Sequence, residues 1–194
     1  YMKPNLIWQK NNFTIRFAQP SDFEPYFNNS FCPSDKEVIR LTGSKEKYTK
    51  AEVKAFFQNA IKNEDFYLFL ILSPNQDIIG EVVINEIDHR LRCANFRIAI
   101  FSANARGKGI GSWAVRCIRD FAFEYLKLHR LELDVFDFNP RAKHCYLKAG
   151  FKQEGILRDA VLDGETYANS IIMSILEDEW KEIKKVENNK ENPI

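Results

Sequence analysis

The sequence predicts an α+β domain built on one mixed sheet, and three observations lead to that class. Three apolar strand segments joined by short turns occupy residues 66–101, which is typical of an antiparallel meander. A glycine-rich segment and a long amphipathic run separate this meander from a further strand. The dipeptide Asp163-Gly164 between two apolar segments then indicates a closing hairpin. We therefore expect a mixed central sheet with an antiparallel N-terminal meander, flanking helices and a C-terminal β-hairpin.

The elements before the meander are predicted from periodicity and capping signals. Residues 13–18 alternate apolar and polar side chains, which indicates a first strand, and Pro20 begins a short helix after it. Residues 30–49 show little periodicity, so we interpret them as a loop with a broken helix. Thr49 and Glu52 form a capping box, which opens a helix with one apolar stripe: Val53, Phe56, Phe57, Ala60 and Ile61.

The remaining elements follow in a simple order. Strands are expected at residues 66–72, 78–87, 95–101 and 131–138, with a helix from the glycine segment to about Lys127. Asn139 caps another helix with Pro140 in its first position, and Gly150 ends it. After the hairpin comes a final amphipathic helix. We expect one domain over residues 13–185 and a solvated tail over 186–194.

Composition excludes several classes of function. The chain has 194 residues, which suits one well-filled core, and its 28 basic and 27 acidic residues create no global field for nucleic acid or an anionic membrane. No apolar run reaches the roughly 18 residues of a spanning helix. Its 4 cysteines are scattered without a C-x-x-C pair, which favours a reducing cytoplasm over disulfides or zinc. The histidines form no metal-binding motif, so we expect no metal.

The glycine segment is the strongest functional signal. Gly107, Gly109 and Gly111 stand where a helix begins, although glycine is a poor helix residue. A helix start exposes unpaired amides and is electropositive, and bare backbone lets an anion approach those amides directly. Arg106 and Lys108 add positive charge beside them. The segment therefore predicts a phosphate-binding loop, although a glycine-rich connection with solvated basic residues is the simpler alternative.

Two common phosphate-binding motifs do not account for this segment. Nothing in the chain fits the nucleotide-triphosphate pattern G-x-x-x-x-G-K-[ST]. Residues 109–114 do match the dinucleotide variant G-x-G-x-x-A, and Asp134 stands at a plausible distance downstream. In that fold the glycine turn follows the first strand of a repeated β-α-β array. Here an antiparallel meander precedes it, so we reject the dinucleotide interpretation.

From Thr14 to about Trp180 the sequence resembles the GNAT acyl-CoA N-acyltransferases, in particular the ribosomal-protein N-terminal and polyamine acetyltransferase branches. The pyrophosphate loop of that family, R/Q-x-x-G-x-G/A, is similar to residues 106–111. A second signature, an Asn before a helix that carries a Tyr and ends in Gly-Phe, matches Asn139, Tyr146 and residues 150–151. The resemblance implies acetyl-CoA as cosubstrate and direct acetyl transfer to a primary amine.

The resemblance also implies the site residues. The strand before the loop binds the acetyl and pantetheine groups through its backbone, and Asn139 and Tyr146 lie on the cofactor side. The expected cofactor contacts are Ile98, Ala99, Ile100, Arg106, Gly107, Lys108, Gly109, Ile110, Gly111, Ser112, Asn139 and Tyr146. We expect Tyr146 to protonate the leaving thiolate and Glu86 to accept the proton of the amine. Alternative bases are Glu81, Asp88 and Asp134.

The acceptor is less well defined by the sequence. The early loop, residues 32–50, carries Lys36, Arg40, Lys45, Lys47 and Lys50 against few acids. This charge disfavours a polycation such as spermidine and leaves a small amine, an amino acid or a protein N-terminus. Polyamine acetylation remains the alternative, and a non-catalytic acyl-CoA-binding sensor or interaction module is an alternative of another class. The edge strand of the closing hairpin is a candidate homodimer contact.

Overall fold

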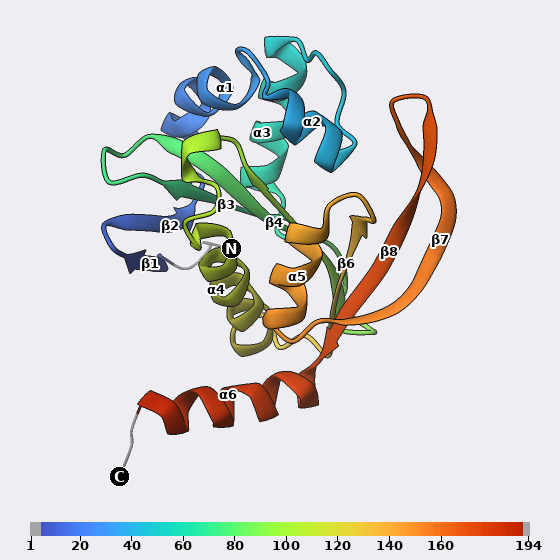
Figure 1. The fold of residues 1–194 in the computed structure, drawn as a ribbon. Helices are drawn as coiled ribbons and strands as arrows, with labels where there is room; N and C mark the ends of the chain where they lie inside the picture. The colour runs from blue at the N-terminus through green and yellow to red at the C-terminus, as the bar shows by residue number, and fades with distance from the viewer. Residues whose placement is uncertain (1–4, 192–194) are drawn as a thin grey trace. The chain divides into compact units, whose positions relative to one another are not determined.

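The computed structural model describes residues 5–191, whose strands form one 8-stranded mixed sheet in the order β1-β2-β3-β4-β5-β6-β8-β7 (Figure 1). Strand β5 pairs parallel to β6. The antiparallel pairs are β1–β2, β2–β3, β3–β4, β6–β8 and β7–β8, and β4 is next to β5 in the sheet order. The predicted single α+β domain is confirmed. The strands are β1 (Ile7–Lys10), β2 (Phe13–Phe17), β3 (Tyr67–Leu72), β4 (Ile78–Asp88), β5 (Cys93–Ile100), β6 (Arg130–Phe136), β7 (Lys152–Asp163) and β8 (Thr166–Leu176).

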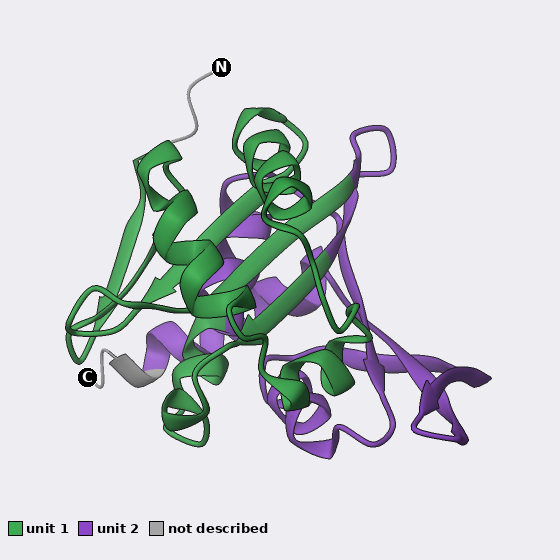
Figure 2. Cartoon of the chain, turned by 90° about the horizontal axis from the view of Figure 1, so that it is seen from above, with its two compact units in different colours: residues 1–86, 96–114 green, residues 87–95, 115–194 purple. Residues whose placement is uncertain are grey.

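The helices occupy the segments between these strands. They are η1 (Pro20–Asp22), α1 (Phe23–Phe31), α2 (Lys36–Thr42), α3 (Lys50–Lys62), η2 (Ala103–Ala105), α4 (Ile110–Glu124), α5 (Pro140–Lys148) and α6 (Glu177–Glu191). The internal contacts of the chain divide into two compact units, residues 1–86 with 96–114 and residues 87–95 with 115–194 (Figure 2). No helix among the described residues is long and apolar enough to cross a membrane.

The first unit places helices α1, α2 and α3 on one side of its strands (Figure 1). Its core joins α1 and α3 to β3 through a cluster of aromatic and aliphatic side chains, in which Tyr26 and Phe57 have ring centroids 5.0 Å apart. The capping box of α3 is present as predicted. The Thr49 side chain accepts from the Glu52 amide, and Glu52 Oε2 accepts from the Thr49 amide at 2.7 Å.

Strands β4 and β5 lie very close together within this unit. The Phe101 amide donates to the Ile79 carbonyl at 2.8 Å, and a Cβ at Gly80 would stand 2.6 Å from the Ala99 carbonyl oxygen. Only glycine fits at position 80 without moving backbone. This register places the Glu81 backbone beside Ala99, and residues alternate between the two faces of the strand from there.

The second unit packs α4, α5 and α6 with strands β6, β7 and β8. Arg119 on α4 is fully buried, and its guanidinium donates to the Ala149 carbonyl at 2.7 Å and lies 3.2 Å from Glu187. Trp180 on α6 stacks on Phe123 with ring centroids 5.3 Å apart. These contacts attach the final helix to α4.

The structure differs from the sequence predictions at the two ends of the chain and in the hairpin. Strand β1 was not predicted, because its 4 residues are too few to show a periodicity. The final helix continues to Glu191, so residues 186–191 of the predicted solvated tail are helical, and Val186 among them is 54% exposed. The Arg119 contact to Glu187 explains the extra turns. Residues 192–194 of that predicted tail lie outside the described residues. The hairpin turn is Gly164-Glu165, one residue later than predicted, because Asp163 pairs with Thr166.

Candidate active site

The glycine loop leads directly into α4, as the sequence predicted. Gly107 and Gly109 have φ of +76° and +78°, a left-handed conformation that favours glycine. Nothing lies within 4 Å of a Cβ built on either residue. Gly107, Lys108 and Gly109 are exposed, whereas Ile110 is buried and Gly111 and Ser112 are half-buried. The backbone before the first turn of α4 is therefore open to an anion.

Arg106 contacts protein groups rather than standing free beside this loop. Its guanidinium donates to the carbonyls of Ile100 and Phe101, both at 3.2 Å, and forms ion pairs with Asp35 and Glu37 at the start of α2. The side chain is only 10% exposed. The positive charge predicted at this loop is therefore partly neutralised at Arg106, and Lys108 is the exposed cation.

The strand segment predicted to hold the acetyl group lies beside the same loop. Ile98, Ala99 and Ile100 are all half-buried. A Cβ on Gly111 would stand 3.9 Å from Ile100 Cγ1, so the side chain of Ile100 faces the first turn of α4. Residues Ile98 and Ile100 share that face, and Ala99 shares the opposite face with Arg97.

The opposite face carries a carboxylate–phenol pair. The Tyr26 hydroxyl on α1 donates to Glu81 Oε2 on β4 at 2.7 Å. Burial raises the pKa of Glu81, while the Tyr26 hydrogen bond and the charge of Arg97 act in the opposite direction. Burial and the Glu81 charge raise the pKa of Tyr26 well above its ordinary value. At neutral pH the phenol therefore keeps its proton and donates a hydrogen bond to the carboxylate.

The other carboxylates considered as bases have different surroundings. Glu86 is exposed and has φ of +55°, so it stands at an irregular point of β4. Asp88, in the second unit, accepts from the Leu91 amide at 2.8 Å and shapes a turn. Asp134 accepts from the Ser170 hydroxyl at 3.1 Å. Of the four, Glu81 is the one held by a buried tyrosine.

Asn139 and Tyr146 belong to the second unit. The Asn139 side chain caps α5 by accepting from the Ala142 amide at 3.2 Å, as predicted. Tyr146 is buried and its ring lies 5.9 Å from that of Phe151. Burial raises the pKa of the Tyr146 phenol, and the nearby Cys145 and Asp134 raise it further. The phenol is therefore fully protonated near neutral pH, as a proton donor must be.

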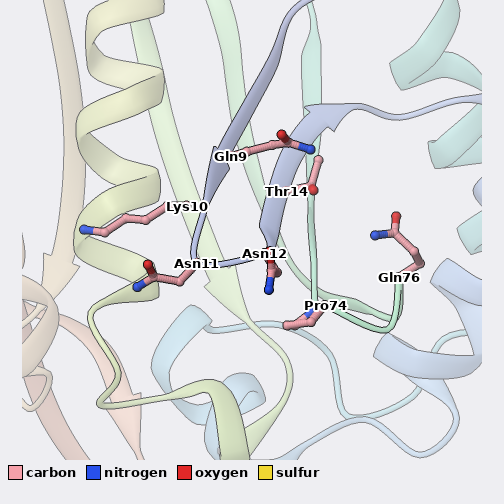
Figure 3. Close-up of a pocket in the computed structure, with 7 residues that line it drawn as sticks. All are labelled: Gln9, Lys10, Asn11, Asn12, Thr14, Pro74 and Gln76. Atoms are coloured by element: carbon pink, nitrogen blue, oxygen red, sulfur yellow. The ribbon is translucent and has the colours of Figure 1, made fainter.

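A separate hollow lies at two turns of the first unit. It has a volume of about 450 Å³ and is lined by Gln9, Lys10, Asn11, Asn12, Thr14, Pro74 and Gln76, at the β1–β2 and β3–β4 turns (Figure 3). It contains none of the predicted site residues. Among residues 5–191 no group of three or more His, Cys, Asp or Glu side chains is arranged to hold a metal ion.

An open glycine loop at a helix start, after an antiparallel meander in a mixed sheet, defines a protein of the acyl-CoA-dependent acyltransferase class. Residues 12–152 match the family model described as acetyltransferase (GNAT) domain, and the chain belongs to that family. It is an N-acetyltransferase that uses acetyl-CoA as cosubstrate.

Individual acetyltransferases are similar to this chain in sequence and in fold. A spermidine N(1)-acetyltransferase of Vibrio cholerae is 29% identical over 129 residues, which cover 66% of this chain and 74% of that enzyme. The structure of spermidine N-acetyltransferase from Vibrio cholerae with CoA and spermine superposes with a TM-score of 0.78 at 24% identity, over 89% of this chain and 99% of that one. A ribosomal-protein-S5-alanine acetyltransferase from Vibrio fischeri gives 0.80 at 19% identity, over 91% and 99%. The last two likenesses concern the fold.

Sequence reasoning gave the Tyr26–Glu81 pair no role as a unit. Glu81 was predicted only as an alternative base, and Tyr26 was given no functional role. One signal was available: Glu81 is the single charged residue in the otherwise apolar segment 78–84. An acid in such a segment needs a buried partner, although the sequence does not identify that partner.

Proposed function

We propose that the protein acetylates a primary amine that lacks a second cationic group, such as a small amine, an amino acid or a protein N-terminus. Acetyl-CoA binds with its pyrophosphate at residues 106–112 and its thioester along Ile98, Ala99 and Ile100. Tyr146 protonates the departing thiolate, and Asn139 positions the helix that carries it. The sequence predicted Glu86 as the proton acceptor, and Glu81 is its principal rival.

The charge around α2 supports this choice of acceptor. A polyamine is bound by carboxylates, but Asp35 and Glu37 already form ion pairs with Arg106. Cations dominate the rest of residues 32–50, and Lys45 stands over the Tyr48 ring at 5.8 Å. A second ammonium group would meet this positive charge with few free acids to receive it. This use of the two acids by Arg106 is the observation on which the acceptor proposal depends.

Polyamine acetylation is the second candidate, because the Vibrio cholerae relative is a spermidine N(1)-acetyltransferase. The experiment is an acceptor panel with acetyl-CoA, in which thiol release and product mass are measured for monoamines, amino acids, an N-terminal peptide, spermidine and spermine. We expect at least one monocationic acceptor to exceed spermidine in kcat/KM by tenfold or more. Highest kcat/KM for the polyamines would establish the alternative. CoA binding without turnover of any acceptor would instead support a sensor or interaction module.

We also propose a homodimer formed through the closing hairpin. Strand β7 is last in the sheet order, and Ile156, Leu157 and Leu162 on it are 51%, 54% and 61% exposed. Apolar side chains on an edge strand favour pairing with a second copy. Sedimentation equilibrium should give twice the chain mass for the wild type and a monomer for Leu157→Lys. The four free cysteines support the reducing cytoplasm as the proposed location.

A further inference from the structure

The carboxylate of Glu81 lacks the partner that a half-buried charge normally has. It accepts from the Tyr26 hydroxyl at 2.7 Å, and within the described residues no cationic side chain reaches it within ion-pair distance. Arg97 influences it only through its charge and is itself exposed. Removing a carboxylate from water is costly unless a cation or several donors compensate. One phenol compensates only in part, so the pair has the chemistry of a site for an ammonium ion.

The tyrosine of the pair is packed among aromatic side chains of the core. The Tyr26 ring lies 5.5 Å from Phe31, 5.0 Å from Phe57 and 6.2 Å from Phe101, measured between centroids. Phe31 in turn contacts Tyr48 at 5.5 Å. These core contacts fix the Tyr26 ring and with it the position of the hydroxyl at Glu81. The aromatic residues are on α1, on the segment before α3, on α3 and directly after β5.

The position of the pair relative to β5 gives it a catalytic use. Gly80 is in backbone contact with Ala99, so Glu81 is one residue from the segment proposed to hold the thioester. Ile100 faces the glycine loop from the other side of that strand. An amine at Glu81 would thus approach β5 from the face opposite the cofactor loop.

We propose that Glu81, held by Tyr26, binds the ammonium group of the acceptor and takes its proton; this inference rests on the proposed function. The ammonium N–H bond breaks and its proton passes to the carboxylate, leaving a lone pair on nitrogen. Nitrogen then bonds to the acetyl carbonyl carbon as the carbon–sulfur bond breaks. The thiolate takes a proton from Tyr146, the second N–H bond of the positively charged nitrogen breaks and its proton returns through water to the Tyr146 oxygen, and Glu81 releases its proton to water. The sum is an amide, a free thiol and one released proton.

The groups that face Glu81 set its pH dependence. They are Tyr26 on α1 and Arg97 on β5, and Tyr48, before α3, acts on Tyr26. Burial raises the pKa of the Glu81 carboxyl, which brings it closer to that of an amine and makes it a better base. The Tyr26 hydrogen bond stabilises the carboxylate, so its removal should raise that pKa further.

The test measures kcat/KM against pH for the wild type, Glu81→Gln, Tyr26→Phe and the control Asp77→Asn, with the best monoamine of the panel. Asp77 is an exposed acid at the β3–β4 turn. We expect Glu81→Gln to lose 10²-fold or more in kcat/KM and to lose the acid limb, with acetyl-CoA affinity retained by calorimetry. Tyr26→Phe, which keeps the ring packing, should fold and shift the acid limb to higher pH. Asp77→Asn should match the wild type.

The outcomes separate the two proposals. If the wild type acetylates the amine but folded Glu81→Gln keeps its full kcat/KM and its acid limb, the inference is overturned. An unshifted acid limb in Tyr26→Phe also overturns it, and so does loss of that limb in Glu86→Gln alone. If the wild type binds acetyl-CoA but turns over no amine, the proposed function is overturned and this inference with it.

Discussion

The guanidinium of Arg106 lies 3.0 Å from the carboxylate of Asp35, the residue that caps helix α2. The same guanidinium pairs with Glu37 in the first turn of that helix and donates to the carbonyls at the end of β5. One side chain therefore joins three segments of the first unit: the glycine loop, β5 and α2. The positive charge of the guanidinium makes each of these hydrogen bonds charge-assisted, and its burial leaves them partly desolvated.

Arg106→Gln should loosen α2 without unfolding the unit. The variant leaves Asp35 and Glu37 without their cation, and charge-assisted hydrogen bonds contribute about 1.5–3 kcal/mol each. Helix α2 has only 7 residues and no buried side chain, so little else holds it. We expect amide hydrogen exchange in α2 to accelerate at least tenfold. The control Arg90→Gln, at an exposed turn, should leave α2 unchanged, and equal exchange in both variants would contradict the prediction.

Gly111→Val should weaken acetyl-CoA binding while the protein stays folded. Gly111 lies in the first turn of α4 with ordinary helical φ. A Cβ added to it would lie 3.9 Å from its nearest neighbour, Ile100 Cγ1. The added side chain therefore finds room inside the protein but crowds the anion approaching the amides. Loss of one charge-assisted hydrogen bond, about 1.5–3 kcal/mol, corresponds to at least a tenfold rise in Kd. Gly155→Val on β7, also uncrowded, is the control for calorimetry. An unchanged Kd in folded Gly111→Val would refute the phosphate-binding loop.

The ion pair of Glu154 with Arg130 predicts a measurable acid dependence of stability. Arg130 Nη1 lies 2.8 Å from Glu154 Oε1, and this pairing together with the Ser174 hydroxyl lowers the pKa of Glu154 to about 2. A carboxylate with a depressed pKa stabilises the fold above its unfolded pKa of about 4.3, and this contribution disappears as the pH falls toward 2. Because the side chain is 41% exposed, we expect less than about 1 kcal/mol.

The measurement for this pair is urea unfolding of wild type and Glu154→Gln between about pH 2 and about pH 6, a range that includes the loss expected between roughly pH 4.3 and pH 2. The difference in unfolding free energy should be largest at the upper end and shrink toward the acid end. A difference that stays constant over this range would mean that the carboxylate charge contributes nothing. Glu165→Gln, at the exposed hairpin turn, serves as the control.

The sequence predicted the fold well where local chemistry determines it. The capping box at Thr49, the Asn139 cap and the open glycines before Ile110 each act within a few residues, and each is present in the structure. The apolar runs of the meander reflect the near-continuous burial of β3 and β4 and are equally readable. The class of enzyme was predicted from the resemblance of residues 106–111 and 139–151 to the motifs of the family.

What the sequence could not supply depends on contacts between distant residues. Tyr26 and Glu81 are 55 positions apart, and Arg106 and Glu37 are 69 apart, so neither pairing leaves a local pattern. The positive charge of Arg106, which we expected to bind the phosphate, is therefore partly neutralised by the acids at the start of α2. The last turns of α6 were missed for the same reason, since Glu187 reaches Arg119 across 68 positions.

Tyr146→Phe tests the proposed proton donor and should lower kcat by roughly 10²-fold or more, with little change in acetyl-CoA affinity. The ring packs 5.9 Å from Phe151, and phenylalanine preserves this contact, so the variant removes only the hydroxyl. Burial raises the pKa of the phenol, so the group stays protonated at neutral pH and can donate as negative charge develops on sulfur. Tyr125→Phe is the matched control, because Tyr125 is 51% exposed on the same unit.

Turnover of Tyr146→Phe is measured at saturating acetyl-CoA and amine, together with the Kd for acetyl-CoA by calorimetry and the melting temperature. A fall in kcat at unchanged Kd and melting temperature separates proton donation from packing. Near-full turnover in folded Tyr146→Phe would make the tyrosine structural and leave water as the acid.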